Sequence, residues 1–193
     1  MNLWDILYIV LGYFVGAIPT GIIVSKYFKG PDLQNTGSGN IGATNVTRTM
    51  GKKFGAITLF GDAGKAFLVV LFARLFFPNT DYTICLAALA CLLGNTYSIF
   101  LGFSGGKGVS TTFGIYFALA PLVALVAAII DAAIVYFAKI SAIGSLIGMI
   151  VLFVGILFSG LHLIYIVFTL IIVAIVFFRH KNNIQELIKS WKS

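Results

Sequence analysis

The sequence predicts an all-α integral membrane protein with about seven transmembrane helices, the N-terminus outside and the C-terminus cytoplasmic. Hydrophobic residues make up 60% of the 193 and charged residues only 10%, whereas soluble domains are about 45–50% apolar and about 25% charged. Apolar runs recur along the chain, and the basic residues gather in polar segments between them. Most of this chain therefore has lipid as its solvent.

Seven apolar segments account for the predicted helices. A helix needs about 20 apolar residues to cross the hydrocarbon core. The candidate spans are residues 3–26, 55–77, 82–100, 109–120, 122–138, 141–158 and 161–178. Some of them are short or broken. We expect residues 1–193 to form a single membrane-embedded domain.

The charge distribution decides the topology. Lys and Arg accumulate on the cytoplasmic side of membranes, and here they gather in the loop 29–53, the loop 101–108 and the tail after 178. If all three face the cytoplasm, an even number of crossings must follow Lys107. The stretch 109–138 must then supply two spans, broken near Pro121, where a helix loses a hydrogen bond.

The first polar loop is the most informative segment. Between Thr36 and Arg48 it is dense in glycine, hydroxyl and amide residues. Glycines let backbone N–H groups converge on an anion, and an arginine adds a planar fork for phosphate oxygens. A plain flexible loop does not explain the polar residues of this segment, namely Ser38, Asn40, Thr44 and Asn45. The spacing Gly37-x-Gly39-x-x-Gly42 is not a dinucleotide fingerprint, because that motif requires a βαβ unit.

Two further clusters repeat the theme. The loop 102–108 contains Gly105, Gly106, Lys107 and Gly108. It is not a P-loop, because the lysine is followed by glycine rather than Ser or Thr. In the tail, His180 and Asn183 have the spacing that shares one face of a short helix. The alternative for this tail is an interfacial cap whose basic side chains reach the headgroups.

Some acidic and basic residues lie well inside the predicted spans. Asp62 and Lys65, near the cytoplasmic third of the second span, are predicted to pair, which is the usual state of intramembrane charges. Asp131 lies within 122–138. An acid inside the membrane is usually functional or paired. The alternative is that Asp131 faces a polar interior or the edge of the bilayer.

Small residues in the spans have simpler interpretations. Cys85 and Cys91 share one apolar segment and show no metal-binding spacing, so we expect small core residues. The pairs Gly12–Gly16 and Gly144–Gly148 permit close contact between helices.

The residue pattern favours direct transfer between two bound substrates. No Ser/His/Asp arrangement, lipase elbow or metal-ligand set is recognisable in the sequence, and no cofactor is expected. The protein would supply position and positive potential. Nucleic acid is not predicted as a partner, because the basic residues lie between apolar runs. The main alternative is a transporter or flippase for a phosphorylated solute or lipid, and a membrane interaction protein is a more distant one.

Four motifs carry a resemblance to a known family. They are residues 16–21 (Gly-Ala-Ile-Pro-Thr-Gly), 37–48, 105–109 and 179–184. In order and separation they resemble those of the bacterial membrane acyl-phosphate:glycerol-3-phosphate acyltransferases, the PlsY family. The similarity covers nearly the whole chain. The sequence departs from the family pattern at Asn95 and Ser98, where histidine and proline are usual.

The resemblance implies a reaction and a site. An acyl group would move from acyl phosphate to the sn-1 hydroxyl of glycerol 3-phosphate, giving lysophosphatidic acid and phosphate for phospholipid synthesis. The enzyme would lie in the bacterial inner membrane among membrane lipid, with its site facing the cytoplasm. The implied catalytic residues are His180, Lys107 and Arg48, with either His180 or a substrate phosphate taking the proton. The implied substrate-binding residues are Ser38, Gly39, Asn40, Thr44, Asn45, Arg48, Gly105, Gly106, Lys107, Gly108, His180 and Asn183.

Overall fold

The computed structural model of the protein describes residues 1–78 and 80–192. Helices are the only regular elements in these two ranges, apart from a single isolated β-bridge between Ser98 and Ser104. The predicted all-α class is therefore confirmed. The chain divides into two compact units, Met1–Leu119 and Ala120–Ser193. A single functional domain over the whole chain stays a prediction.

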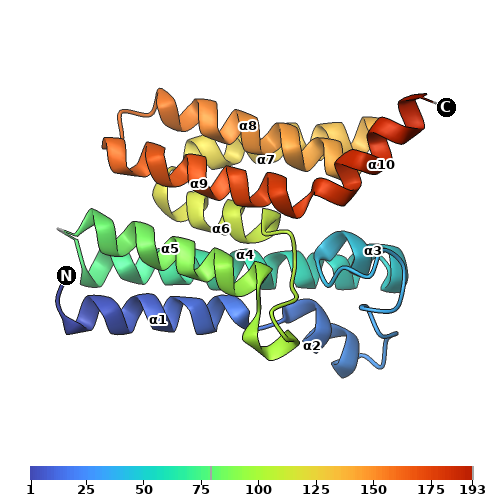
Figure 1. The fold of residues 1–193 in the computed structure, drawn as a ribbon, viewed down its shortest axis with the longest axis horizontal. Coiled ribbons are helices and arrows are strands. Elements are labelled where there is room, and N and C mark those ends of the chain that lie inside the picture. Colours follow the sequence, from blue (N-terminus) through green and yellow to red (C-terminus); the bar gives the residue numbers. More distant parts are fainter. Residues whose placement is uncertain (79, 193) are drawn as a thin grey trace. The chain divides into compact units, whose positions relative to one another are not determined.

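The first unit contains both glycine-rich loops (Figure 1). Helix α5 packs along α1, and α4 packs against α3, α5 and α6. The helices are α1 (Leu3–Ala17), α2 (Thr20–Tyr27), α3 (Ala43–Met50), α4 (Lys52–Phe76), α5 (Asp81–Thr96), the 3-10 turn η1 (Ile99–Leu101) and α6 (Val109–Leu119).

Small residues allow α1 and α5 to approach closely. A Cβ added to Gly16 would clash with the backbone of Cys91, and one added to Gly12 would lie 3.0 Å from the carbonyl oxygen of Ala87. The predicted role of Gly12–Gly16 in helix packing is confirmed. Cys85 and Cys91 are buried and carry free thiols, which agrees with their prediction as core residues.

The predicted first span, 3–26, is broken. Helix α1 ends at Ala17, α2 begins at Thr20, and the two helices are bent by 41°. Pro19 explains the break, because it has no N–H to donate and disfavours the helical conformation of the residue before it. Accordingly, Ile18 has φ −57° and ψ 115°.

The predicted loop 29–53 contains a helix. Helix α3 occupies Ala43–Met50, and α4 begins at Lys52 rather than near residue 55. Gly51 separates the two helices at φ +97°, a conformation that glycine adopts without the usual penalty. Thr44, Asn45 and Arg48 therefore lie on a helix and not in an irregular loop.

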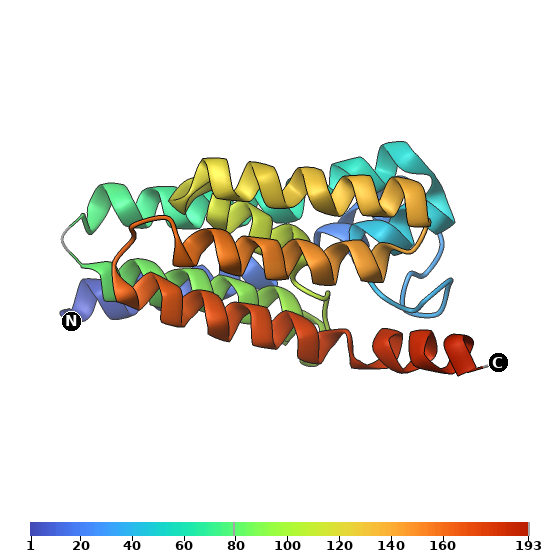
Figure 2. The same ribbon diagram turned by 90° about the horizontal axis from the view of Figure 1, so that it is seen from above.

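The second unit is a helical hairpin followed by a third helix and a tail. Helix α8 packs against both α7 and α9, as Figure 2 shows. The helices are α7 (Pro121–Ala138), α8 (Ser141–Leu157), α9 (Leu163–Arg179) and α10 (Lys181–Lys192). Pro121 occupies the first turn of α7, where its missing N–H costs nothing, so the predicted division of 109–138 near this proline is confirmed.

Length and composition identify candidate membrane crossings. Helices α4 and α7 are each long and apolar enough to cross a bilayer, and the bent pairs α1–α2 and α9–α10 raise the number to as many as four. Helices α5, α6 and α8 are apolar but shorter. Each predicted segment thus has its helix, while the count of seven crossings and their direction stay predictions.

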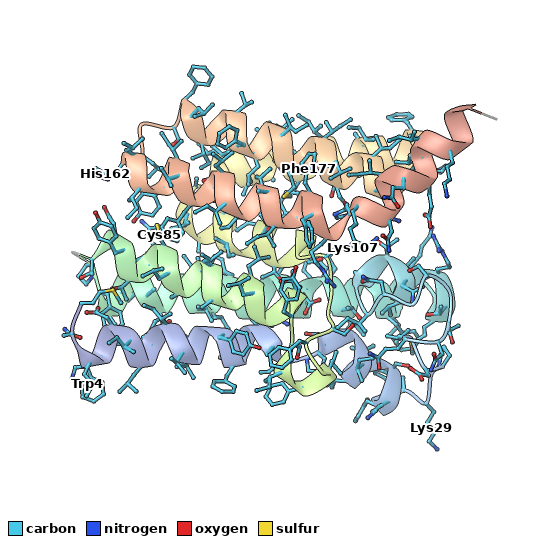
Figure 3. All side chains as sticks on the ribbon, in the orientation of Figure 1. Trp4, Lys29, Cys85, Lys107, His162 and Phe177 are labelled. Carbon is cyan, nitrogen blue, oxygen red and sulfur yellow. The ribbon has the colours of Figure 1, made fainter. Side chains whose placement is uncertain are left out.

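Large apolar side chains cover the outside of the helices. Trp4 is 71% exposed and points away from α1 in Figure 3, and Phe137 is 80% exposed on α7. Outward-facing rings of this size are expected where the surrounding solvent is lipid.

Candidate active site

The first polar loop folds around the side chain of Asn45. This residue lies on α3 and is 1% exposed. Its amide Nδ2 donates to the carbonyl oxygens of Thr36 at 2.9 Å and Leu33 at 3.3 Å, and its Oδ1 accepts the N–H of Ser38 at 2.9 Å. The amide therefore shapes the loop from the inside. Direct contact between Asn45 and a substrate stays a prediction.

Glycines allow the tight turn around that amide. Gly37 and Gly39 have φ of +68° and +69°, the left-handed region that glycine enters readily. The N–H of Gly39 donates to the carbonyl of Thr36 at 3.2 Å. Ser38 and Gly39 are exposed, whereas Asn40 is half-buried and its Oδ1 accepts the N–H of Gly42 at 2.8 Å.

Helix α3 presents a polar face outward. Asn45 and Val46 are buried, while Thr44 and Arg48 are exposed. The two exposed residues are four apart, so they lie one turn from each other on the same face of the helix. A guanidinium and a hydroxyl have donors suited to phosphate oxygens, and phosphate binding by Arg48 and Thr44 stays a prediction.

The second glycine loop is held against the end of α5. The N–H of Gly106 donates to the carbonyl of Asn95 at 2.9 Å. A Cβ on Gly105 would clash with that same carbonyl, so the backbone comes close only because the residue is glycine. Gly108 has φ +83°. The intervening Lys107, labelled in Figure 3, is half-buried.

His180 and Asn183 belong to the second unit. His180 is 3% exposed and caps the C-terminal end of α9, which meets α10 at an angle of 56°. Its Nδ1 lies 2.8 Å from the carbonyl oxygen of Val176. Because a carbonyl only accepts, this hydrogen bond requires a proton on Nδ1. Asn183 is half-buried in the first turn of α10.

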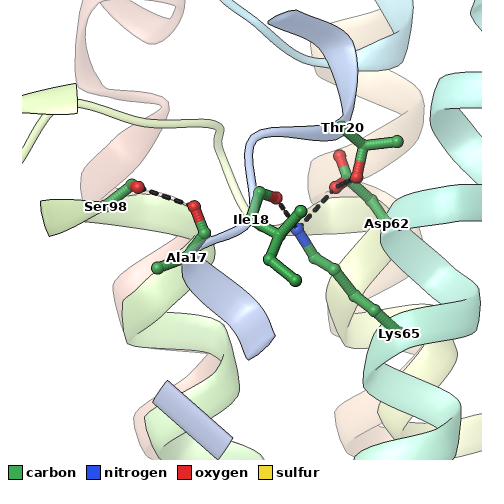
Figure 4. Close-up of polar contacts among 6 residues, drawn as sticks. All are labelled: Ala17, Ile18, Thr20, Asp62, Lys65 and Ser98. Carbon is green, nitrogen blue, oxygen red and sulfur yellow. Dashed lines mark hydrogen bonds and ion pairs between the residues drawn. The ribbon is translucent and has the colours of Figure 1, made fainter. Parts of the chain in front are cut away.

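A polar network at the end of α1 was only partly predicted. The predicted pair of Asp62 and Lys65 is confirmed, with Nζ 2.8 Å from Oδ1. The sequence did not reveal that the Thr20 hydroxyl binds Asp62, or that the Ser98 hydroxyl binds the Ala17 carbonyl beside this pair (Figure 4). Pro19 was the available signal, because a proline inside an apolar span leaves carbonyl groups that need partners.

Asp131 lies on α7 facing α8, and a Cβ on Gly144 would lie 2.7 Å from its Oδ1. Among the described residues, no group of three or more His, Cys, Asp or Glu side chains has an arrangement that could hold a metal ion.

The fold and its polar clusters define an integral membrane protein with sites suited to phosphate. The family model described as glycerol-3-phosphate acyltransferase matches residues 6–190. The glycerol-3-phosphate acyltransferase of Neisseria meningitidis serogroup C / serotype 2a is 41% identical over 184 residues, covering 94% of this chain and 92% of the relative. That of Aquifex aeolicus is 36% identical, covering 93% of both.

Solved structures agree with these relatives. The crystal structure of PlsY, an integral membrane glycerol 3-phosphate acyltransferase, in its glycerol 3-phosphate form has a TM-score of 0.92 and 35% identity, covering 96% of this chain and 92% of that one. The lysophosphatidic acid form has a TM-score of 0.90 and 34% identity. This chain belongs to the glycerol-3-phosphate acyltransferase family. It is an acyltransferase enzyme, and the resemblance found in the sequence is confirmed.

Proposed function

We propose that this chain transfers a fatty acyl group from acyl phosphate to the sn-1 hydroxyl of glycerol 3-phosphate. The observation that carries the proposal is the match, over nearly the whole chain, to an acyltransferase solved with glycerol 3-phosphate and with lysophosphatidic acid. The acyl phosphate donor is supported by the presence of two separate phosphate-suited loops in one unit. One loop would hold each substrate phosphate.

The proposed step needs no covalent enzyme intermediate. The sn-1 oxygen attacks the acyl carbon, a carbon–oxygen bond forms, and the bond between the acyl carbon and the phosphate oxygen breaks. The products are lysophosphatidic acid and inorganic phosphate. The hydroxyl proton passes either to Nε2 of His180 or directly to a substrate phosphate oxygen.

The proposed roles of the site residues follow from their exposure. Ser38, Thr44 and Arg48 are exposed and contact a substrate phosphate, together with the N–H groups of the first loop. Lys107 neutralises charge on the departing phosphate. Asn45 acts from inside the loop. The enzyme thus contributes positioning and electrostatic stabilisation, which account for much of the rate enhancement in many enzymes.

The proposed setting is the bacterial inner membrane with the site on the cytoplasmic side. The positive charge of the three polar clusters supports this orientation. Glycerol 3-phosphate is a soluble anion, and it would reach these clusters from the water. The acyl chain of the donor would remain beside the apolar helices.

Purified protein with acyl phosphate and glycerol 3-phosphate tests the proposal. We expect inorganic phosphate and lysophosphatidic acid to appear in equal amounts. A parallel reaction with acyl-CoA tests the donor. Turnover with acyl-CoA and none with acyl phosphate would refute the donor, and phosphate release without lysophosphatidic acid would refute acyl transfer to glycerol 3-phosphate.

A further inference from the structure

The break in the first apolar segment exposes carbonyl groups that need partners. The last carbonyls of any helix have no partner within it, and Pro19 prevents the chain from continuing α1. In this structure Ser98 Oγ donates to the Ala17 carbonyl at 2.6 Å, and Lys65 Nζ donates to the Ile18 carbonyl at 2.6 Å (Figure 4). Side chains from α4 and from the turn after α5 therefore complete the end of α1.

A buried ion pair links both sides of the break. Lys65 Nζ lies 2.8 Å from Asp62 Oδ1, and the two side chains are 9% and 10% exposed. The same Oδ1 accepts the hydroxyl of Thr20, the first residue of α2, at 2.8 Å. Lys65 thus binds the residue before Pro19, and Asp62 binds the residue after it. Removing either partner would leave an uncompensated charge in a buried site.

The chain on each side of this break contacts one of the two glycine loops or the turn beside it. Ser98 opens the turn before the second loop: its carbonyl accepts the N–H of Phe103 at 2.8 Å, and its N–H donates to Ser104 at 3.3 Å. On the other side, α2 touches the first loop. A Cβ on Gly21 would clash with the carbonyl of Ile41, which is 7% exposed. The network therefore connects two loops that are about 60 residues apart in the sequence.

We propose that Thr20, Asp62, Lys65 and Ser98 are positioning residues that fix the two glycine loops relative to each other. The inference rests on the proposed function, in which each loop holds one phosphate. Transfer requires the reacting groups to lie within about 3–3.5 Å, and small misplacements are costly. A network that only stabilised the fold would change the unfolding temperature without changing kcat/KM of the folded enzyme.

The chain offers a matched control for Thr20. At the opposite end of α1, Thr83 Oγ1 donates to Asp5 Oδ1 at 2.9 Å, and both residues are buried. Thr20→Val and Thr83→Val each remove one hydroxyl–carboxylate hydrogen bond between neighbouring helices. We expect both to lower the unfolding temperature, but only Thr20→Val to lower kcat/KM for glycerol 3-phosphate, by roughly 10-fold. Equal effects of the two on kcat/KM would overturn the proposal.

Lys65 provides the second test, with a conservative rescue. Lys65→Met should reduce kcat/KM more than Thr20→Val, and Lys65→Arg should recover part of the loss because it restores a charged donor. Folded Lys65→Met with wild-type kcat/KM would contradict the proposal.

Loop geometry is also measurable without turnover. Spin labels at Gln34→Cys and Phe103→Cys report the distance between the loops; both positions are exposed, and the native Cys85 and Cys91 are buried. The distance distribution should be as narrow in Thr83→Val as in the parent, and broader in Thr20→Val. An unchanged distribution in Thr20→Val would refute the positioning role. A wild-type protein without acyltransferase activity would refute the proposed function instead.

Discussion

At the scale of single residues, the two cations proposed to bind phosphate have different surroundings. Arg48 is exposed on a helix face one turn from Thr44, whereas Lys107 is half-buried between glycines. A guanidinium forms two parallel hydrogen bonds with a phosphate, and an ammonium acts as a compact point charge. Exchanging one for the other therefore changes geometry as well as charge.

Arg48→Lys is expected to lower kcat/KM by about 10- to 100-fold, since a charge-assisted hydrogen bond contributes about 1.5–3 kcal/mol. Lys107→Ala should cause a loss of the same order. Lys53→Ala is the control, because this exposed lysine lies in the first turn of α4, outside both glycine loops. Steady-state phosphate release measures all three. Wild-type kinetics in folded Arg48→Lys and Lys107→Ala would remove both residues from the site.

Asn45 and Asn40 differ in the number of hydrogen bonds they make to the backbone of the first loop, so they test what stabilises it. Asn45→Ala removes three side-chain hydrogen bonds to the loop backbone, whereas Asn40→Ala removes only the one from the N–H of Gly42. At about 0.5–1.5 kcal/mol for each hydrogen bond lost, Asn45→Ala should lower the unfolding temperature clearly more than Asn40→Ala. Thermal unfolding in detergent gives the comparison, and the reverse order would contradict this account of the loop.

Asn95 tests whether a titratable group is needed beside the second loop. It is 6% exposed, and its backbone carbonyl accepts the N–H of Gly106. This is a structural role at the end of α5, and it needs no titratable side chain. We therefore expect measurable transfer in the natural sequence and only a modest rate change in Asn95→His. A pH–rate profile compares the two. An inactive natural protein rescued strongly by this change would show that proton transfer at position 95 is required.

At the scale of elements, apolar composition and segment length predicted that the helices exist better than they predicted where each helix ends. Apolar composition located a helix in each of the seven segments, because burial in lipid demands long apolar runs. It missed α3, because this helix has only eight residues and most of them are polar. It also missed the partners of the α1 break. Ser98 and Thr20 meet α1 and α4 through tertiary contacts, which no local pattern records.

The contact between α1 and α5 gives a prediction at this scale. A Cβ at Gly16 would lie 2.7 Å from the Cα of Cys91, whereas one at Gly12 would lie 3.0 Å from the oxygen of Ala87. Gly16→Ala must therefore push the backbones apart, and Gly12→Ala needs only a small shift. We expect Gly16→Ala to lower the unfolding temperature markedly more than Gly12→Ala. Equal unfolding temperatures would contradict the close packing at Gly16.

At the scale of the whole molecule, topology connects the three polar clusters to one compartment. Seven crossings with an external N-terminus place residues 36, 104 and 182 in the cytoplasm and residue 159 outside. Single cysteines at these positions, with Cys85 and Cys91 replaced, can be treated with an impermeant thiol reagent on intact cells. Ser159→Cys should react at once. Thr36→Cys, Ser104→Cys and Asn182→Cys should react only after permeabilisation, because the bilayer separates them from the reagent. Labelling of any of these three from outside intact cells would contradict the orientation, and with it a cytoplasmic site.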